Sequence, residues 1–235
     1  LIGSSVYAFT LMLVAFIAGL GLGAVTLSGF IDRRRNPMLF LGGLQIVVAV
    51  ACLAIVPLFG LAPPLVVELV TSWADSFAAL HTAQFVTVFL LMLIPTFAMG
   101  AVFPTVARIY ARDLTGIGRS VGEAYAANTL GSVVGSFVAG FVLIPVLGVR
   151  ASILLAVALN AVLGGVFLLL SDWRTPRFRW SCVTATGGVV LAGIVAVPTW
   201  NTNLLNSAPY LYAYRYKANA RTQGAGLDKV MTGSR

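Results

Sequence analysis

The chain is divided into six long runs of predominantly apolar residues, separated by shorter polar segments. A run of about 20 apolar residues is long enough to cross the hydrocarbon core of a bilayer as a helix. An α-helix also satisfies its backbone hydrogen bonds within one segment, as a lipid-exposed backbone requires. We therefore expect an all-α, polytopic transmembrane helix bundle with about six spans. The expected spans are residues 6–30, 38–62, 85–107, 121–147, 151–170 and 181–198.

The composition excludes a water-soluble globular domain and a disordered chain. Only 9% of the 235 residues are charged and 59% are hydrophobic, whereas soluble domains are about 25% charged and disordered chains are poor in apolar residues. The net charge of +8 could suggest nucleic-acid binding. Most basic residues, however, flank the apolar runs, where the retention of positive charge in the cytosol explains them. We expect the lipid bilayer, and no nucleic acid, as a partner.

Arginine is distributed unevenly over the segments that connect these runs. The first, third and fifth connections carry nine arginines, the second has no Lys or Arg, and the fourth has only Arg150. Short cytoplasmic loops are enriched in Lys and Arg. We therefore expect a multi-pass protein of the cell's inner (plasma) membrane with these three connections in the cytosol. Their arginines are Arg33, Arg34, Arg35, Arg108, Arg112, Arg119, Arg174, Arg177 and Arg179.

The second connection, residues 63–84, is long enough to hold an element of its own. Polar and apolar side chains fall on different faces at helical spacing, so we expect an outer-surface loop that contains an amphipathic helix. The acidic face holds Glu68, Ser72 and Asp75, and the apolar face holds Leu65, Leu69, Trp73 and either Phe77 or Leu80.

The bundle is expected to occupy residues 1–199, and residues 200–235 an aromatic and basic tail followed by a linker. Tyrosines alternate with other residues over 210–217, and a period of two favours a strand. Together with Trp200, these tyrosines could equally form an interfacial aromatic belt. Six spans place the tail outside, but its five Lys or Arg residues favour the inside, so its side of the membrane is left open.

Small residues recur at every fourth position in two of the expected spans. Such rows let membrane helices approach closely. Packing within the bundle is the main expectation, and packing against another subunit is the alternative. The rows are Ala15, Gly19 and Gly23 in the first span and Ala127, Gly131, Gly135 and Ala139 in the fourth.

Few polar side chains lie inside the expected spans, and such residues are functional candidates because their burial in lipid is costly. Ser120 and Glu123 have the spacing of a capping box at a helix start, so Glu123 could serve structure or function. The asparagines could hydrogen-bond between helices or contact a substrate. The four candidates are Gln45, Glu123, Asn128 and Asn160.

The sequence offers no catalytic, cofactor-binding or metal-binding constellation. It has no Ser/His/Asp set, no paired carboxylates at useful spacing, no metal cluster and no phosphate-binding loop. The segment 19–23, GLGLG, lacks the preceding strand of a dinucleotide motif, so we interpret it as a packing signal. We expect no catalytic residue and no cofactor in this chain. Among the prolines inside the spans, Pro95 and Pro145 are expected to kink or locally unwind them.

Two stretches together resemble a known family. The first runs from residues 3–13, GSSVYAFTLML, through 18–24, AGLGLGA, to the DRRR turn at 32–35. The second comprises GAVFP at 100–104, GRSVGEAYAANTLG at 118–131, AGFVLIP at 139–145 and LGVR at 147–150. Both resemble the membrane half of bacterial spermidine synthase-like proteins, in which a transporter-like bundle precedes a soluble aminopropyltransferase domain. The segment SGFIDR at 28–33 is similar to the G-x-x-x-D-R loop of the major facilitator family.

The resemblance implies a facilitator-like fold and a link to polyamine chemistry. It also implies a helix before residue 3 and a synthase domain after the tail, so we expect this chain to be a piece of a longer protein or a processed product. The expected function is that of a non-catalytic anchor, scaffold or partner-binding subunit, with other membrane or periplasmic subunits or a self-oligomer as partners. The alternative is a facilitator-like transporter of a small solute, with a cation as one candidate. An enzymatic, aminopropyltransferase role would belong only to a longer parent chain.

Overall fold

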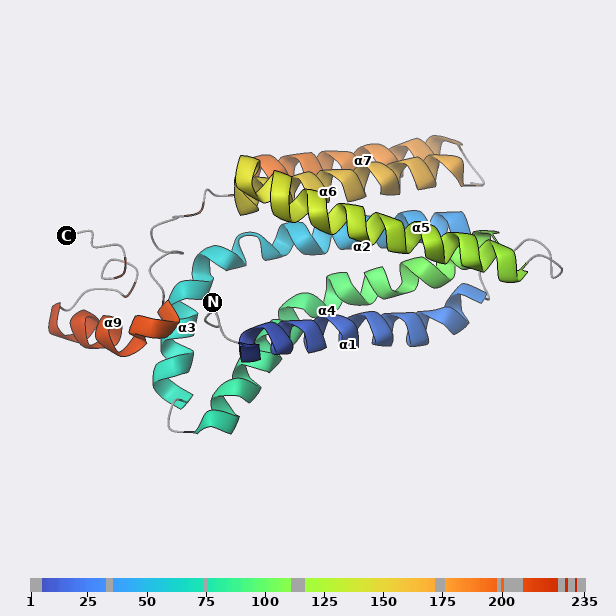
Figure 1. Ribbon diagram of the computed structural model, residues 1–235. Coiled ribbons are helices and arrows are strands. Elements are labelled where there is room, and N and C mark those ends of the chain that lie inside the picture. The colour runs from blue at the N-terminus through green and yellow to red at the C-terminus, as the bar shows by residue number, and fades with distance from the viewer. Residues whose placement is uncertain are drawn as a thin grey trace. The chain divides into compact units, whose positions relative to one another are not determined.

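The computed structural model of the chain is helical (Figure 1). It describes residues 6–32, 36–73, 76–110, 117–171, 176–197, 200, 209–223, 227 and 231. The all-α class predicted from the sequence is confirmed. The elements are α1 (Val6–Asp32), α2 (Pro37–Ile55), α3 (Leu58–Trp73), α4 (Phe77–Tyr110), α5 (Ile117–Val138), the π-helical turn η2 (Ala139–Leu143), α6 (Ile144–Leu170), α7 (Pro176–Ala196) and α9 (Pro209–Gln223).

Four helical segments are long and apolar enough to cross a membrane, which makes this a membrane protein. Leu58–Trp73 and Trp180–Ala196 are apolar but shorter. The six spans and the facilitator-like arrangement stay predictions. The four long segments are Val6–Ile31, Pro37–Ile55, Ala78–Tyr110 and Gly118–Leu170.

The segment Gly118–Leu170 is interrupted near its middle. A straight helix of its 53 residues would measure about 80 Å, far more than a bilayer core of about 30 Å. Gly148 leaves the helical region with φ 80° and ψ 164°, a conformation that glycine adopts readily, and the chain reverses direction there (Figure 1). Just before it, the π-helical turn η2 precedes Pro145, so the local unwinding expected at Pro145 is observed. At Pro95, by contrast, α4 remains helical.

The expected span 38–62 is wrong in its second half. α2 ends at Ile55 and a new helix, α3, begins at Leu58. Pro57 explains the break, because proline has no N–H for the helical ladder and its ring clashes with the preceding turn. The expected loop 63–84 is also corrected, since α3 runs through Pro63 and Pro64 and α4 begins at Phe77.

The apolar face expected for the helix in this region is not the one that packs within the chain. Val67 and Val70 are buried, whereas Leu65 and Trp73 of the expected face are exposed. α3 is largely apolar, so it has more than one apolar flank, and the contact of the expected flank with a membrane surface stays a prediction. Asp75 lies outside the described residues.

The strand considered for the tail is wrong, because α9 is a helix over Pro209–Gln223. Tyr212 and Tyr216 are four residues apart, and their rings meet edge to face with centroids 6.3 Å apart. Alternating tyrosines are thus compatible with a helical face as well as with a strand. Within the expected linker, Leu227 is partly buried against apolar residues of α3, α4 and α9.

At two helices, the side chain of the residue just before the helix fixes where the helix begins. Asn36 Oδ1 accepts a hydrogen bond from the Leu39 N–H at 3.1 Å, and Pro37 occupies the first helical position of α2, which suits a residue without N–H. Ser76 Oγ accepts a bond from the Ala79 N–H at 3.3 Å at the start of α4.

The chain divides into two compact units, each with its own core. The first comprises Leu1–Ile17, Ala54–Leu93 and Val197–Arg235. In it, α9 packs against α3 (Figure 1). The aliphatic stem of Lys217 reaches α3, where its Nζ lies 3.3 Å from Glu68 Oε1 and 2.8 Å from Thr71 Oγ1. The core of this unit is Val67, Val70, Leu80, Ala213 and Met231.

The second unit comprises Ala18–Leu53 and Ile94–Ala196. Here α6 packs against α7, and Gly164 of α6 packs closely on Gly42 of α2. A further core joins the C-terminal part of α1 to α2 and α4. Its buried residues are Ile31, Leu44, Val48, Ala98 and Ala101.

Candidate functional site

A cavity of about 450 Å³ lies between α4 and α5 in the second unit. This volume falls within the range of about 300–1,000 Å³ that is usual for ligand pockets. Each helix contributes four residues at helical spacing. They are Val102, Phe103, Val106 and Tyr110 from α4, and Glu123, Ala124, Ala127 and Asn128 from α5.

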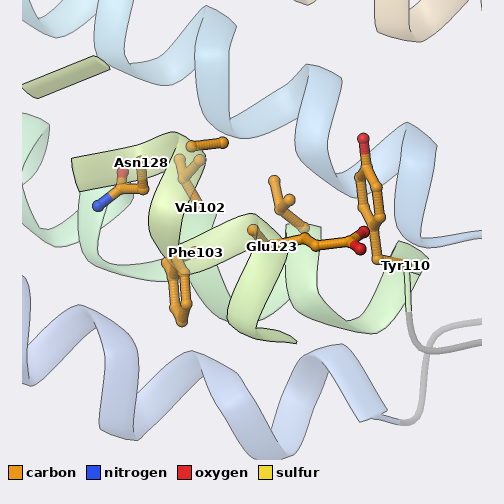
Figure 2. Close-up of a pocket in the computed structure, with 8 residues that line it drawn as sticks. Val102, Phe103, Tyr110, Glu123 and Asn128 are labelled. Atoms are coloured by element: carbon orange, nitrogen blue, oxygen red, sulfur yellow. The ribbon is translucent and has the colours of Figure 1, made fainter. Parts of the chain in front are cut away.

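Three polar side chains line this otherwise apolar cavity. Figure 2 shows the Glu123 carboxylate at the end of the cavity where Tyr110 lies, and Asn128 near Val102 at the other end. Phe103 closes part of the wall, with its ring edge to face against Tyr125 at a centroid distance of 6.1 Å. A carboxylate, a phenol and an amide in an apolar surround can bind a cation or a hydrogen-bond donor.

Glu123 is paired within its own helix. Its Oε1 accepts a hydrogen bond from Arg119 Nε at 2.8 Å, one helical turn earlier. Both side chains are largely exposed, at 87% for Arg119 and 58% for Glu123. The pair therefore leaves the carboxylate open to solvent or to a ligand, and Arg119 is able to swing away without unfolding the helix.

The predicted capping box is wrong. α5 begins at Ile117, so Ser120 lies inside the first turn, whereas a capping serine stands at the residue that precedes the helix. The S-x-x-E spacing recurs in helices by chance, and the neighbouring arginine offered Glu123 a stronger, charged partner. Glu123 therefore forms an ion pair with Arg119 instead of a capping box with Ser120.

The four intramembrane polar candidates divide into two groups. Glu123 and Asn128 both line the cavity, at opposite ends of it. Gln45 is on α2 and Asn160 on α6, and neither lines it. The Asn160 Nδ2 donates to the Ala156 carbonyl oxygen at 2.8 Å, so its amide bonds to its own helix rather than to a neighbouring one.

The two rows of small residues are placed differently. On α1, a Cβ at Gly19 would overlap Thr96, and one at Gly23 would overlap the Phe97 carbonyl oxygen of α4. Gly100 of α4 approaches the Leu20 carbonyl oxygen in the same way. These glycines let the two backbones touch, as small-residue rows do in membrane helices.

On α5, a Cβ at Gly131 or Gly135 would meet open space. Ala127, one turn earlier, lines the cavity with α4, and Ala139 lies in η2. Among the described residues, no other helix of this chain packs on Gly131 and Gly135, and the packing of this part of the row against another subunit stays a prediction. Four-residue spacing indicates that a helix can be approached closely, but it does not specify whether the partner belongs to the same chain.

The cavity residues of α4 were not singled out from the sequence. One face of a helix holds Phe103, Val106 and Tyr110, because successive members of this set are three and four residues apart. Such spacing is ordinary in an apolar helix, and only Tyr110, which brings a hydroxyl near the end of the expected span 85–107, gave a usable signal.

The fold and the cavity define an α-helical membrane protein that has a partly polar cavity in its second unit. Comparison with known protein families, curated proteins and solved structures finds no match to this chain.

Proposed function

We propose that this chain is a non-catalytic membrane domain that acts as an anchor, scaffold or partner-binding subunit in a membrane complex. The observation that supports this function is α5, whose apolar side chains are exposed along its length, with Gly131 and Gly135 facing open space. Membrane helices associate through close backbone approach at small residues. A transmembrane helix of another subunit, or of a second copy, is the partner that this face suits.

The face open to a partner continues from the cavity. At 3.6 residues per turn, Ala127, Gly131 and Gly135 lie along one side of α5, and Ala127 lines the cavity with α4. A partner helix seated on Gly131 and Gly135 would meet Asn128 at the cavity end, where an amide can hydrogen-bond across helices.

Substitution of Gly131 and Gly135 tests this function. Leucine at both positions fills the space that a partner helix needs, and we expect the complex in native membranes to lose its partner, measured by cross-linking and native mass. Gly122 is the matched control, because it is also exposed and open but lies on the opposite side of α5. The proposal would be contradicted if the Gly131/Gly135 double variant and the Gly122→Leu variant lost the partner to the same extent, or if both retained it.

The resemblance to the membrane half of spermidine synthase-like proteins supports the same function, with an inner-membrane location and the arginine-rich connections in the cytosol. Arg33–Arg35, Arg112 and Arg174 lie outside the described residues. Cysteines introduced at Gly118 and Ser72, both exposed, are expected to react with an impermeant reagent from opposite sides of the membrane. Labelling from one side would overturn this topology.

A facilitator-like transporter of a small cationic solute is the second candidate, and the cavity favours it. Transport requires a site with convergent polar groups, and Glu123 and Asn128 supply a carboxylate and an amide. Four intramembrane polar candidates are few for a transport path, which is why the scaffold function is preferred.

A further inference from the structure

The α3–α9 pair of the first unit has an apolar flank and a basic flank. On α3, Leu58, Leu61 and Leu65 are exposed and follow one another at helical spacing on the side away from the buried Val67. α3 is apolar but has only 16 residues, fewer than the roughly 20 that a crossing needs. A short helix with exposed leucines is suited to lie along a bilayer surface with that flank in the acyl region.

The helix that covers the opposite side of α3 is basic and aromatic. α9 carries Arg215, Lys217 and Arg221 and no acidic residue. Lys217 is neutralised by Glu68. Arg215 and Arg221 are exposed, and no ion pair with a described acidic residue involves either of them. Among the described residues, Arg215 and Arg221 are therefore exposed positive charges of α9 outside any ion pair.

Tyrosines accompany these two arginines. Tyr212 and Tyr214 are both exposed on α9, close in sequence to Arg215. Tyr side chains concentrate at the level of lipid headgroups, where the ring meets the acyl boundary and the hydroxyl meets water. Exposed leucines on α3, together with exposed tyrosines and arginines on α9, are the residue types that membrane interfaces favour.

We propose that the α3–α9 pair binds the headgroups of anionic phospholipids, with Arg215 and Arg221 contacting the lipid phosphates. Charge complementarity favours this occupant, because a basic residue beside an anionic bilayer surface strengthens binding about fivefold. Lys217 has a different part. It holds α9 on α3 through Glu68 and Thr71, so that the two arginines are presented on a fixed surface. This inference does not depend on the proposed function of α5.

The test uses the full chain purified in a zwitterionic detergent and titrated with phosphatidylglycerol or phosphatidylcholine in mixed micelles. Lipid retention is measured by native mass spectrometry and stabilisation by the melting temperature. For the wild-type chain we expect phosphatidylglycerol to be retained in preference to phosphatidylcholine. R215Q/R221Q is expected to weaken this preference by about 25-fold at low salt, the product of two fivefold effects. High salt should reduce the wild-type preference in the same direction, because it screens exposed charges.

Matched variants separate the lipid contact from the fold. R215K/R221K keeps both charges and is expected to keep most of the preference. R177Q removes an exposed arginine of α7 and should leave it unchanged. Unaltered phosphatidylglycerol retention in R215Q/R221Q would overturn the proposal. The proposal would also be overturned if inorganic phosphate raised the melting temperature as much as phosphatidylglycerol does, because the site would then bind a free anion. It would likewise be overturned if R215Q/R221Q changed only the number of subunits in the complex, because the arginines would then contact a second copy of the chain.

Discussion

The indole nitrogen of Trp200 donates a hydrogen bond to the Val56 carbonyl oxygen at 2.9 Å. Val56 is completely buried and lies at the break between α2 and α3, directly before Pro57. The Trp200 ring also rests on Phe59, with the ring centroids 5.5 Å apart. A residue that follows the last apolar helix thus satisfies a carbonyl that the proline break leaves without a helical partner.

Substitution of Trp200 by Phe removes the donor and keeps an aromatic ring against Phe59. A buried carbonyl left without a hydrogen bond costs about 1–3 kcal/mol, so we expect a lower melting temperature in detergent. Trp180→Phe is the control, because Trp180 is exposed on α7. A Trp200→Phe variant that melts with the wild-type chain would show that water replaces the indole.

The ion pair between Lys217 and Glu68 should contribute to the docking of α9. Lys217 retains 25% of its side-chain exposure and Glu68 60%, and such pairs contribute about 0.2–1 kcal/mol. We expect K217E and E68K each to speed chymotryptic cleavage within α9, and the double variant K217E/E68K to recover part of the loss. Recovery measures the coupling between the two charges. An additive double variant would assign the contact to Thr71 alone.

Helix positions could largely be predicted from the sequence, because apolar runs of bilayer length allow little else. The break at Pro57 could not, since Pro63, Pro64, Pro95 and Pro104 all lie inside helices. Whether a proline ends a helix depends on the contacts available to the backbone around it, and at this break Trp200 bonds the Val56 carbonyl oxygen from 144 residues away. Such a contact leaves no local pattern.

Half of the cavity could be predicted. Glu123 and Asn128 stand out as polar residues in an apolar run, so the α5 wall was accessible to sequence reasoning. The α4 wall consists of Val102, Phe103 and Val106, together with Tyr110, and these residue types are common in any membrane helix. The ion pair of Glu123 was predictable in principle from the four-residue spacing to Arg119, but the capping-box pattern competed with it.

A methyl group at Gly23 should disrupt the contact of α1 with α4. The added Cβ would overlap the Phe97 carbonyl oxygen, and a backbone atom has no rotamer by which to move away. We expect Gly23→Ala to destabilise the chain by about 1–3 kcal/mol, the usual cost of overpacking. The matched control is Gly21→Ala on the same helix, where a Cβ meets open space. Similar melting temperatures for the two variants would show that the helices do not pack this closely.

Substitution of Glu123 distinguishes the scaffold from the transporter. Glu123→Gln keeps the size of the side chain and removes its charge, and its pairing with Arg119 is exposed, so we expect only a small fall in melting temperature. Arg119→Gln breaks the same pair but keeps the carboxylate in the cavity. If the chain is a scaffold, the uptake rate of a small organic cation such as spermidine into proteoliposomes should equal the leak rate of protein-free vesicles. This should hold for the wild-type chain and for both variants. A cation transporter predicts uptake by the wild-type chain and by Arg119→Gln, and its loss in Glu123→Gln, because an intramembrane site for a cation needs the ionised group itself. That pattern would replace the scaffold by the transporter.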